Sequence, residues 1–176
     1  MQDDLLGSKT NNIWTNIDDE EVLSHLGDVD VKIPHSGYDR ACVFKNSGQT
    51  IVANAWTLLT FDDEKYDTND LHDNVTNNSR LTIQKDGLYQ IRANIETDAQ
   101  EKKSYEIKIF KNGVEIPHSH IPGYGSKNSS TLVLHSVVPY SELVAGDYVE
   151  VQIRHDNATG AFIYEDSTYF EIERRY

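Results

Sequence analysis

Acidic side chains are concentrated in one polar stretch of the chain, residues 62–73. Carboxylate oxygens are the hard ligands that Ca²⁺ prefers, so this stretch is a candidate calcium site. The ligand order differs from that of an EF-hand, because no glycine or closing glutamate falls where that loop requires one. Two interpretations therefore stand: a solvated acidic surface, or a calcium site with Asp67, Asp70 and Asp73 as ligands.

Other side chains with reactive chemistry are scattered along the chain. His118 and His120 could present two imidazoles to zinc, but they have no cysteine partner. Cys42 is the single cysteine, which rules out an intramolecular disulfide, and its apolar neighbours indicate a small buried residue. The chain has no Gly-x-Ser-x-Gly, P-loop, His-Glu-x-x-His or dinucleotide motif. We therefore expect no enzymatic activity and, calcium aside, no cofactor. Glycosidase chemistry stays open, because the separation of two carboxyl groups is a three-dimensional quantity.

Charge and composition limit the partners of this 176-residue chain, which has a net charge of −13 and a pI near 4.8. Neutralising phosphates requires clustered Lys and Arg, so we expect no nucleic-acid partner and no binding to an anionic membrane. No stretch approaches the roughly 20 apolar residues of a membrane-spanning helix. The first seven residues are acidic and lack the basic and apolar regions of a secretory signal, so we expect synthesis in the cytoplasm without signal-dependent export.

The elements that must position these residues are β-strands. The clearest one, residues 85–95, starts with the turn signal Asp86-Gly87, which predicts a positive φ at Gly87, and then alternates apolar and polar residues. Turn signals separate further strand-like runs at 40–45, 50–61, 79–84, 104–110, 114–116, 130–138, 148–154, 161–165 and 167–174. Residues 62–78 and 117–127 are expected to be loops, and Asn112-Gly113 to be a tight turn. The pattern predicts an all-β antiparallel sandwich or barrel.

Residues 1–37 have a different pattern, and the break at 34–37 predicts a boundary between an N-terminal arm and a main domain of residues 38–176. Within the arm, capping residues and charges predict one small helix over 15–27. Its narrow apolar stripe consists of Ile17, Val22, Leu23 and Leu26, with Trp14 just before it. A helix this short is marginal alone in water, so it docks either on its own sandwich or on a larger assembly.

Four motifs occur in a set order and spacing: residues 86–91, 109–113, 143–151 and 168–172. Together they resemble the jelly-roll domain shared by the globular head of the complement recognition subcomponent and by tumour necrosis factor. The resemblance covers about residues 40–176. Versions of this domain in tailed-phage structural proteins are a closer match. In those proteins a strand like residues 53–61, an acidic loop like 67–73 and a segment like 77–82 lead into the Gly-x-Tyr strand.

The resemblance implies a compact homotrimer, with the first and last strands near the three-fold axis and no catalysis. The strand at 85–95 would belong to the sheet that neighbouring protomers cover, which would place Gln90 or Arg92 at a subunit contact. The full set of expected interface residues is Tyr89, Gln90, Arg92, Tyr148, Tyr169 and Phe170. The chain lacks the collagen-like stalk of the animal proteins, and residues 1–37 take its place as an attachment arm.

The expected function is that of a structural virion protein of a tailed phage. The trimeric jelly roll would decorate the capsid or form a head or tail fibre, with the arm bound to the major capsid or tail protein. One alternative is a receptor- or carbohydrate-binding module, in which Tyr124, flanked by Gly123 and Gly125, stacks on a cell-surface glycan. A second alternative, a cytokine-like or complement-like ligand, agrees less well with the missing secretory signal.

Overall fold

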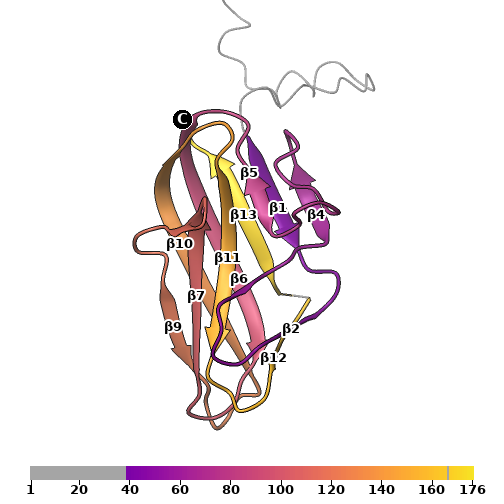
Figure 1. Ribbon diagram of the computed structural model, residues 1–176, viewed down its shortest axis with the longest axis vertical. Helices are drawn as coiled ribbons and strands as arrows, with labels where there is room; N and C mark the ends of the chain where they lie inside the picture. Colours follow the sequence, from indigo (N-terminus) through magenta and orange to yellow (C-terminus); the bar gives the residue numbers. More distant parts are fainter. Residues whose placement is uncertain (1–38, 166) are drawn as a thin grey trace, which may run out of the picture. The chain divides into compact units, whose positions relative to one another are not determined.

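The computed structural model describes residues 39–165 and 167–176 (Figure 1). The predicted arm, its helix and its stripe residues Trp14, Ile17, Val22, Leu23 and Leu26 lie outside the described residues. The described part is built from strands: β1 (Arg40–Phe44), β2 (Gln49–Ile51), β3 (Thr57–Leu58), β4 (Asp63–Asp67), β5 (Arg80–Thr82), β6 (Gly87–Asp98), β7 (Ser104–Lys111), β8 (Val114–Glu115), β9 (Ile121–Tyr124), β10 (Thr131–Leu143), β11 (Tyr148–His155), β12 (Ala161–Ile163) and β13 (Tyr169–Arg174). Among these residues, none forms a helix that could cross a membrane.

The strands form two antiparallel sheets. Sheet A has seven strands in the order β2-β12-β6-β13-β1-β4, with β10 also paired to β6. Sheet B has six strands, in the order β3-β11-β7-β8, with β5 paired to β11 and β9 paired to β7. The first strand, β1, pairs with the last, β13, and Figure 1 shows these two side by side. Residues 39–165 and 167–176 thus form an all-β antiparallel jelly-roll sandwich, as the sequence predicted for the main domain.

Alternation along β6 produces the core. Tyr89, Ile91, Ala93 and Ile95 point into the sandwich and are fully buried, while the residues between them point outward. Alternate residues of β7 and β11 supply the opposite wall of the core. Burying a side chain as large as Ile stabilises the fold by about 1.5–3 kcal/mol, so this alternation fixes which face of β6 remains outside.

Three segments differ from the expected strand pattern. Residues 50–61 are two strands instead of one: Asn54 has a φ of 60°, and the chain there leaves sheet A for sheet B. The expected loop 62–78 contains β4, an edge strand of charged residues that lacks apolar alternation because it is only half covered. The expected loop 117–127 contains β9, in which Pro122 is tolerated because β9 pairs with β7 at the border of sheet B.

Two glycines test the turn predictions. Asn112 and Gly113 both have a positive φ, 51° and 78°, and they join β7 to β8 as a two-residue hairpin, which confirms that turn. Gly87 does not have the positive φ that was expected, because it already belongs to the extended strand β6. A Cβ at Gly87 would collide with Arg174 and with the carbonyl oxygen of Tyr176. Glycine is needed there for the close approach of the C-terminal residues.

Candidate functional site

The face of sheet A that points away from the core is a continuous surface across β1, β13, β6 and β10. Residues paired in an antiparallel register point to the same side of a sheet, so the strand registers define its members. This surface, the sheet A face, contains two cross-strand rows: Cys42, Glu171, Arg92 and Val137, and then Phe44, Tyr169, Asn94 and His135.

A network of hydrogen bonds crosses the sheet A face. Arg92 donates from Nη1 to Glu171 Oε2 at 3.1 Å and from Nη2 to Gln90 Oε1 at 2.6 Å. The Tyr66 hydroxyl donates to the other Glu171 oxygen at 2.8 Å, and Arg175 donates to Gln90. The Arg92 and Glu171 side chains are 34% and 17% exposed. Because Arg92 and Glu171 are paired within the protomer, a partner can cover these two side chains without leaving either as an isolated buried charge.

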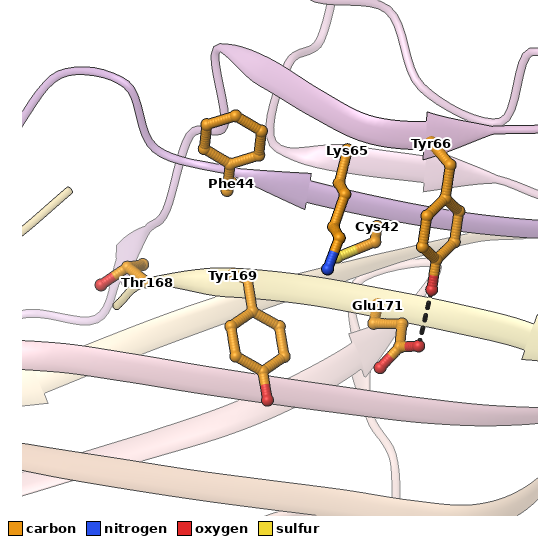
Figure 2. A pocket seen from close by; sticks show the side chains of 7 residues that line it. All are labelled: Cys42, Phe44, Lys65, Tyr66, Thr168, Tyr169 and Glu171. Atoms are coloured by element: carbon orange, nitrogen blue, oxygen red, sulfur yellow. Dashed lines mark hydrogen bonds between the residues drawn. The ribbon is translucent and has the colours of Figure 1, made fainter. Parts of the chain in front are cut away.

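A hollow of about 570 Å³ lies beside this network. Figure 2 shows the Lys65 amine directed toward the Cys42 sulfur, with the Tyr66–Glu171 hydrogen bond nearby. The remaining lining residues are Phe44, Thr168 and Tyr169. Lys65 and Tyr66 are consecutive, and side chains normally alternate, but the β1–β4 register shifts between Cys42 and Val43. This irregularity lets both side chains line the same hollow.

The hollow is suited to binding more than to nucleophilic chemistry. Burial, followed by the charge of Glu171, raises the pKa of the Cys42 thiol, so it is protonated at neutral pH and lacks the thiolate that attacks a substrate. Burial and the hydrogen bond to Glu171 also raise the pKa of Tyr66. Cys42 is 9% exposed, which confirms its expected burial, but it faces the hollow instead of the core.

The six expected interface residues do not form one surface. Gln90, Arg92 and Tyr169 lie on the sheet A face. Tyr89 and Phe170 are fully buried in the protomer's own core, so their assignment to an interface is wrong. They occupy the alternate positions of β6 and β13, which point between the sheets. Tyr148 lies in sheet B, where the Arg80 guanidinium sits 4.0 Å from the centre of its ring.

The structure does not assemble a calcium site from Asp67, Asp70 and Asp73. Asp67 accepts the backbone N–H of His72 at 2.8 Å, and Asp73 accepts those of Val75 and Thr76. These two carboxylates therefore stabilise turns. Over residues 39–165 and 167–176, no group of three or more His, Cys, Asp or Glu side chains could hold a metal ion.

Tyr124 ends β9, opposite Ser104 of β7, and its side chain is 70% exposed. It is therefore open to solvent at the border of sheet B, although the expected loop around it is partly a strand.

The sequence indicated that residues 130–138 form a buried strand, but it did not assign Val133 and Val137, which lie on the sheet A face, or the nearby Tyr140 to an interface. Val133 is 50% exposed, Val137 37% and Tyr140 62%. Their neighbours Leu134 and Val138 point into the core, so this strand is apolar on both faces. A strand apolar on both faces is typical of one that is covered on both sides, and that signal was present in residues 130–138.

Comparison with known proteins supports the fold. No protein-family model matches the sequence, and no curated protein matches it either. Crystal structures of murine APRIL at pH 8.0 and pH 8.5 match with TM-scores of 0.57 and 0.56 at 10% identity, and the structure at pH 5.0 matches with 0.57 at 9%. Each match covers 78% of this chain and 99% of the APRIL chain.

These matches define the class of fold: a jelly roll like that of tumour necrosis factor and the complement globular head. At such low identity they establish the fold alone.

Proposed function

We propose that this chain is a non-enzymatic binding module that assembles as a homotrimer through the sheet A face. The observation that carries the proposal is the combination on that face of exposed apolar side chains with an already paired ionic network. Apolar patches of this kind on a soluble protomer mark interaction surfaces. The resemblance to trimeric jelly rolls supports a second copy of the chain as the occupant.

The test compares two arginines that match in exposure and in the distance to a glutamate partner. Arg92 pairs with Glu171 on sheet A, and Arg154 pairs with Glu106 on sheet B; both arginine side chains are 34% exposed, and both ion pairs measure 3.1 Å. Arg92→Glu places two like charges inside the proposed interface, so the mass measured in solution should fall from trimer toward monomer. Arg154→Glu should leave the trimer intact. A wild-type chain that is monomeric at micromolar concentration would refute the proposal.

We further propose that the trimer is a structural virion protein of a tailed phage, held on the capsid or tail by residues 1–37. The support is the likeness of residues 53–61, 67–73 and 77–82 to tailed-phage jelly rolls, together with the acidic chain. A reconstruction of particles should then contain three-fold density for the jelly roll. A chain without residues 1–37 should still trimerise but should no longer bind particles. If it still decorates them, the arm is not the anchor.

A carbohydrate-binding module is the second candidate, and the 70% exposure of Tyr124 favours it. An exposed tyrosine ring offers an apolar face and a polar tip to a sugar. Binding on a glycan array that is lost in Tyr124→Ala would support this function, whereas binding that is unchanged in the variant would exclude Tyr124 from it.

A further inference from the structure

Asp39, the residue just before β1, is a fully buried carboxylate with two nitrogen neighbours. Its Oδ1 accepts hydrogen bonds from Lys85 Nζ at 3.2 Å and from Asn69 Nδ2. Its Oδ2 is buried without a hydrogen-bond partner among the described residues. An amine, a side-chain amide and a buried carboxylate therefore meet at one oxygen atom, although they come from segments far apart in the sequence.

Tyr89 positions this cluster on its core side. Its hydroxyl donates to the Lys85 carbonyl oxygen at 2.7 Å, which holds the backbone of the turn that carries the amine. Burial, followed by the nearby charge of Asp39, raises the pKa of Tyr89 to about 12. The Lys85 side chain reaches the cluster from the surface and is 52% exposed, so a small leaving group can escape to solvent.

We propose that Lys85 and Asn69 become joined by an isopeptide bond between Nζ and Cγ, with Asp39 carrying the proton. The inference rests on the contacts of Asp39 and is independent of the proposed function.

The reaction balances without any co-reactant. Asp39 takes a proton from the Lys85 ammonium, which frees the lone pair of Nζ to attack Cγ of Asn69. The Nζ–Cγ bond forms, and the Cγ–Nδ2 bond breaks as the Asp39 carboxyl returns its proton to Nδ2. Ammonia leaves with the electron pair of the broken bond. The second proton of the newly bonded Nζ passes to the Asp39 carboxylate and then to the departing ammonia, which leaves as ammonium. One ammonium and one primary amide thus become one secondary amide and one ammonium ion, so charge is conserved and nothing is oxidised or reduced.

The bond would tie the turn after β4 to the turn before β6. It would close a covalent loop from Asn69 to Lys85, and such a loop restricts the unfolded chain as a disulfide does. The sandwich has a single cysteine among its described residues and cannot use a disulfide for this purpose. The cross-linked chain should therefore unfold at a higher temperature than a chain in which the bond cannot form.

The test is intact mass spectrometry of the full chain, followed by peptide mapping. We expect a mass lower than the sequence mass by one ammonia, and a branched peptide that contains both Lys85 and Asn69. Trypsin should not cleave after the modified Lys85. Lys85→Arg keeps the positive charge beside Asp39 but removes the nucleophilic amine, so it should restore the full mass and lower the melting temperature.

Two controls make the result specific. Lys103, whose amine donates to the Asp156 carbonyl oxygen at 3.1 Å, is a matched lysine away from Asp39, and Lys103→Arg should retain the ammonia loss. Asn112-Gly113 can also lose ammonia by forming a succinimide, so the position must come from the branched peptide. Full sequence mass after prolonged incubation, or separate Lys85 and Asn69 peptides, would mean that the cluster is only an ion pair and would overturn the proposal.

Discussion

At the residue scale, the Arg92–Glu171 pair contributes little to the stability of one protomer. Ion pairs that remain partly exposed are worth about 0.2–1 kcal/mol, because water screens the charges and both side chains lose rotamer freedom. Arg154–Glu106 on sheet B is equivalent in distance and exposure. The two pairs differ in their surroundings, since Arg92 shares Glu171 with the half-buried Tyr66 on the sheet A face, whereas Arg154 lies in sheet B. The stabilising effect of Arg92 should therefore appear in the association of protomers and not in the folding of a single protomer.

Gly87 provides a prediction about packing. Gly87→Ala inserts a methyl group against Arg174 and the Tyr176 carbonyl, and overpacking of this kind costs about 1–3 kcal/mol. Urea unfolding should show the loss as a lower midpoint with an unchanged slope. In the Arg174→Ala variant, Gly87→Ala should cause a smaller loss of stability, because one of the two clashes is gone.

Gly146 is the matched control for this cycle. It has a φ of 91° and nothing within 4 Å of an added Cβ, so Gly146→Ala strains only the backbone. The loss of stability caused by Gly146→Ala should be the same with and without the Arg174→Ala substitution. An unchanged midpoint for Gly87→Ala would show that the C-terminal residues simply move aside.

At the scale of elements, edge strands explain why part of sheet A escaped prediction. β4 has the sequence Asp-Glu-Lys-Tyr-Asp and lies at the end of the sheet, where charges discourage pairing with another chain. Because a half-covered edge needs no apolar alternation, its sequence resembles a loop. β6, in contrast, is covered on one face along its whole length, and its period of two was readable from the sequence.

The β7–β8 hairpin gives the element-scale prediction. Asn112 holds the turn against the start of β11: its side-chain amide N–H donates to Asp147 at 2.6 Å, and its side-chain carbonyl oxygen accepts the Tyr148 N–H at 2.9 Å. Asn112→Ala removes both bonds and places alanine at a φ of 51°. We expect a loss of about 1–3 kcal/mol in the free energy of unfolding. Asn128→Ala, on an exposed turn, should change it by less than about 0.5 kcal/mol. Equal losses of unfolding free energy in the two variants would show that the hydrogen bonds of Asn112 do not stabilise the fold.

At the scale of the whole molecule, four carboxylates with lowered pKa values make the stability of the fold depend on pH. Backbone N–H groups of Thr76 and Val75 lower the pKa of Asp73, and that of Ser104 lowers the pKa of Asp156. Burial alone would raise the pKa of Asp147, but hydrogen bonds led by Lys111 outweigh it and lower the value. Burial is likewise outweighed at Asp62, where bonds led by Ser47 lower the pKa.

The sign of the pH dependence follows from these directions. A carboxyl with a lower pKa in the folded state stabilises the fold above its unfolded pKa of about 3.9, and this contribution disappears as the pH falls through the folded value. The melting temperature should therefore be nearly constant from about pH 7 to 5 and should fall below about pH 4. The Asp147→Asn variant should have a lower melting temperature than the wild type at pH 7. Its melting temperature should also fall less as the pH is lowered. A melting temperature that rises toward pH 3 would contradict this account.

The sequence by itself determined the local features of this protein. A period of two in residues 88–95 indicates a strand with one buried face, and Asn112-Gly113 indicates a turn with positive φ, because both follow from backbone sterics within a few residues. Enough such strands with turns between them specify an antiparallel sandwich.

Only the tertiary structure decided which side chains meet. Pairing of β1 with β13 and β4 places Cys42 beside Glu171 and Tyr66, and the entry into β1 brings Asp39 to Asn69 and Lys85. The same registers put Tyr89 and Phe170 in the core and leave Gln90 and Arg92 outside. A shift of one residue in a strand register moves every side chain to the opposite face. Register between distant strands is set by packing of the whole core, so no local pattern contains it.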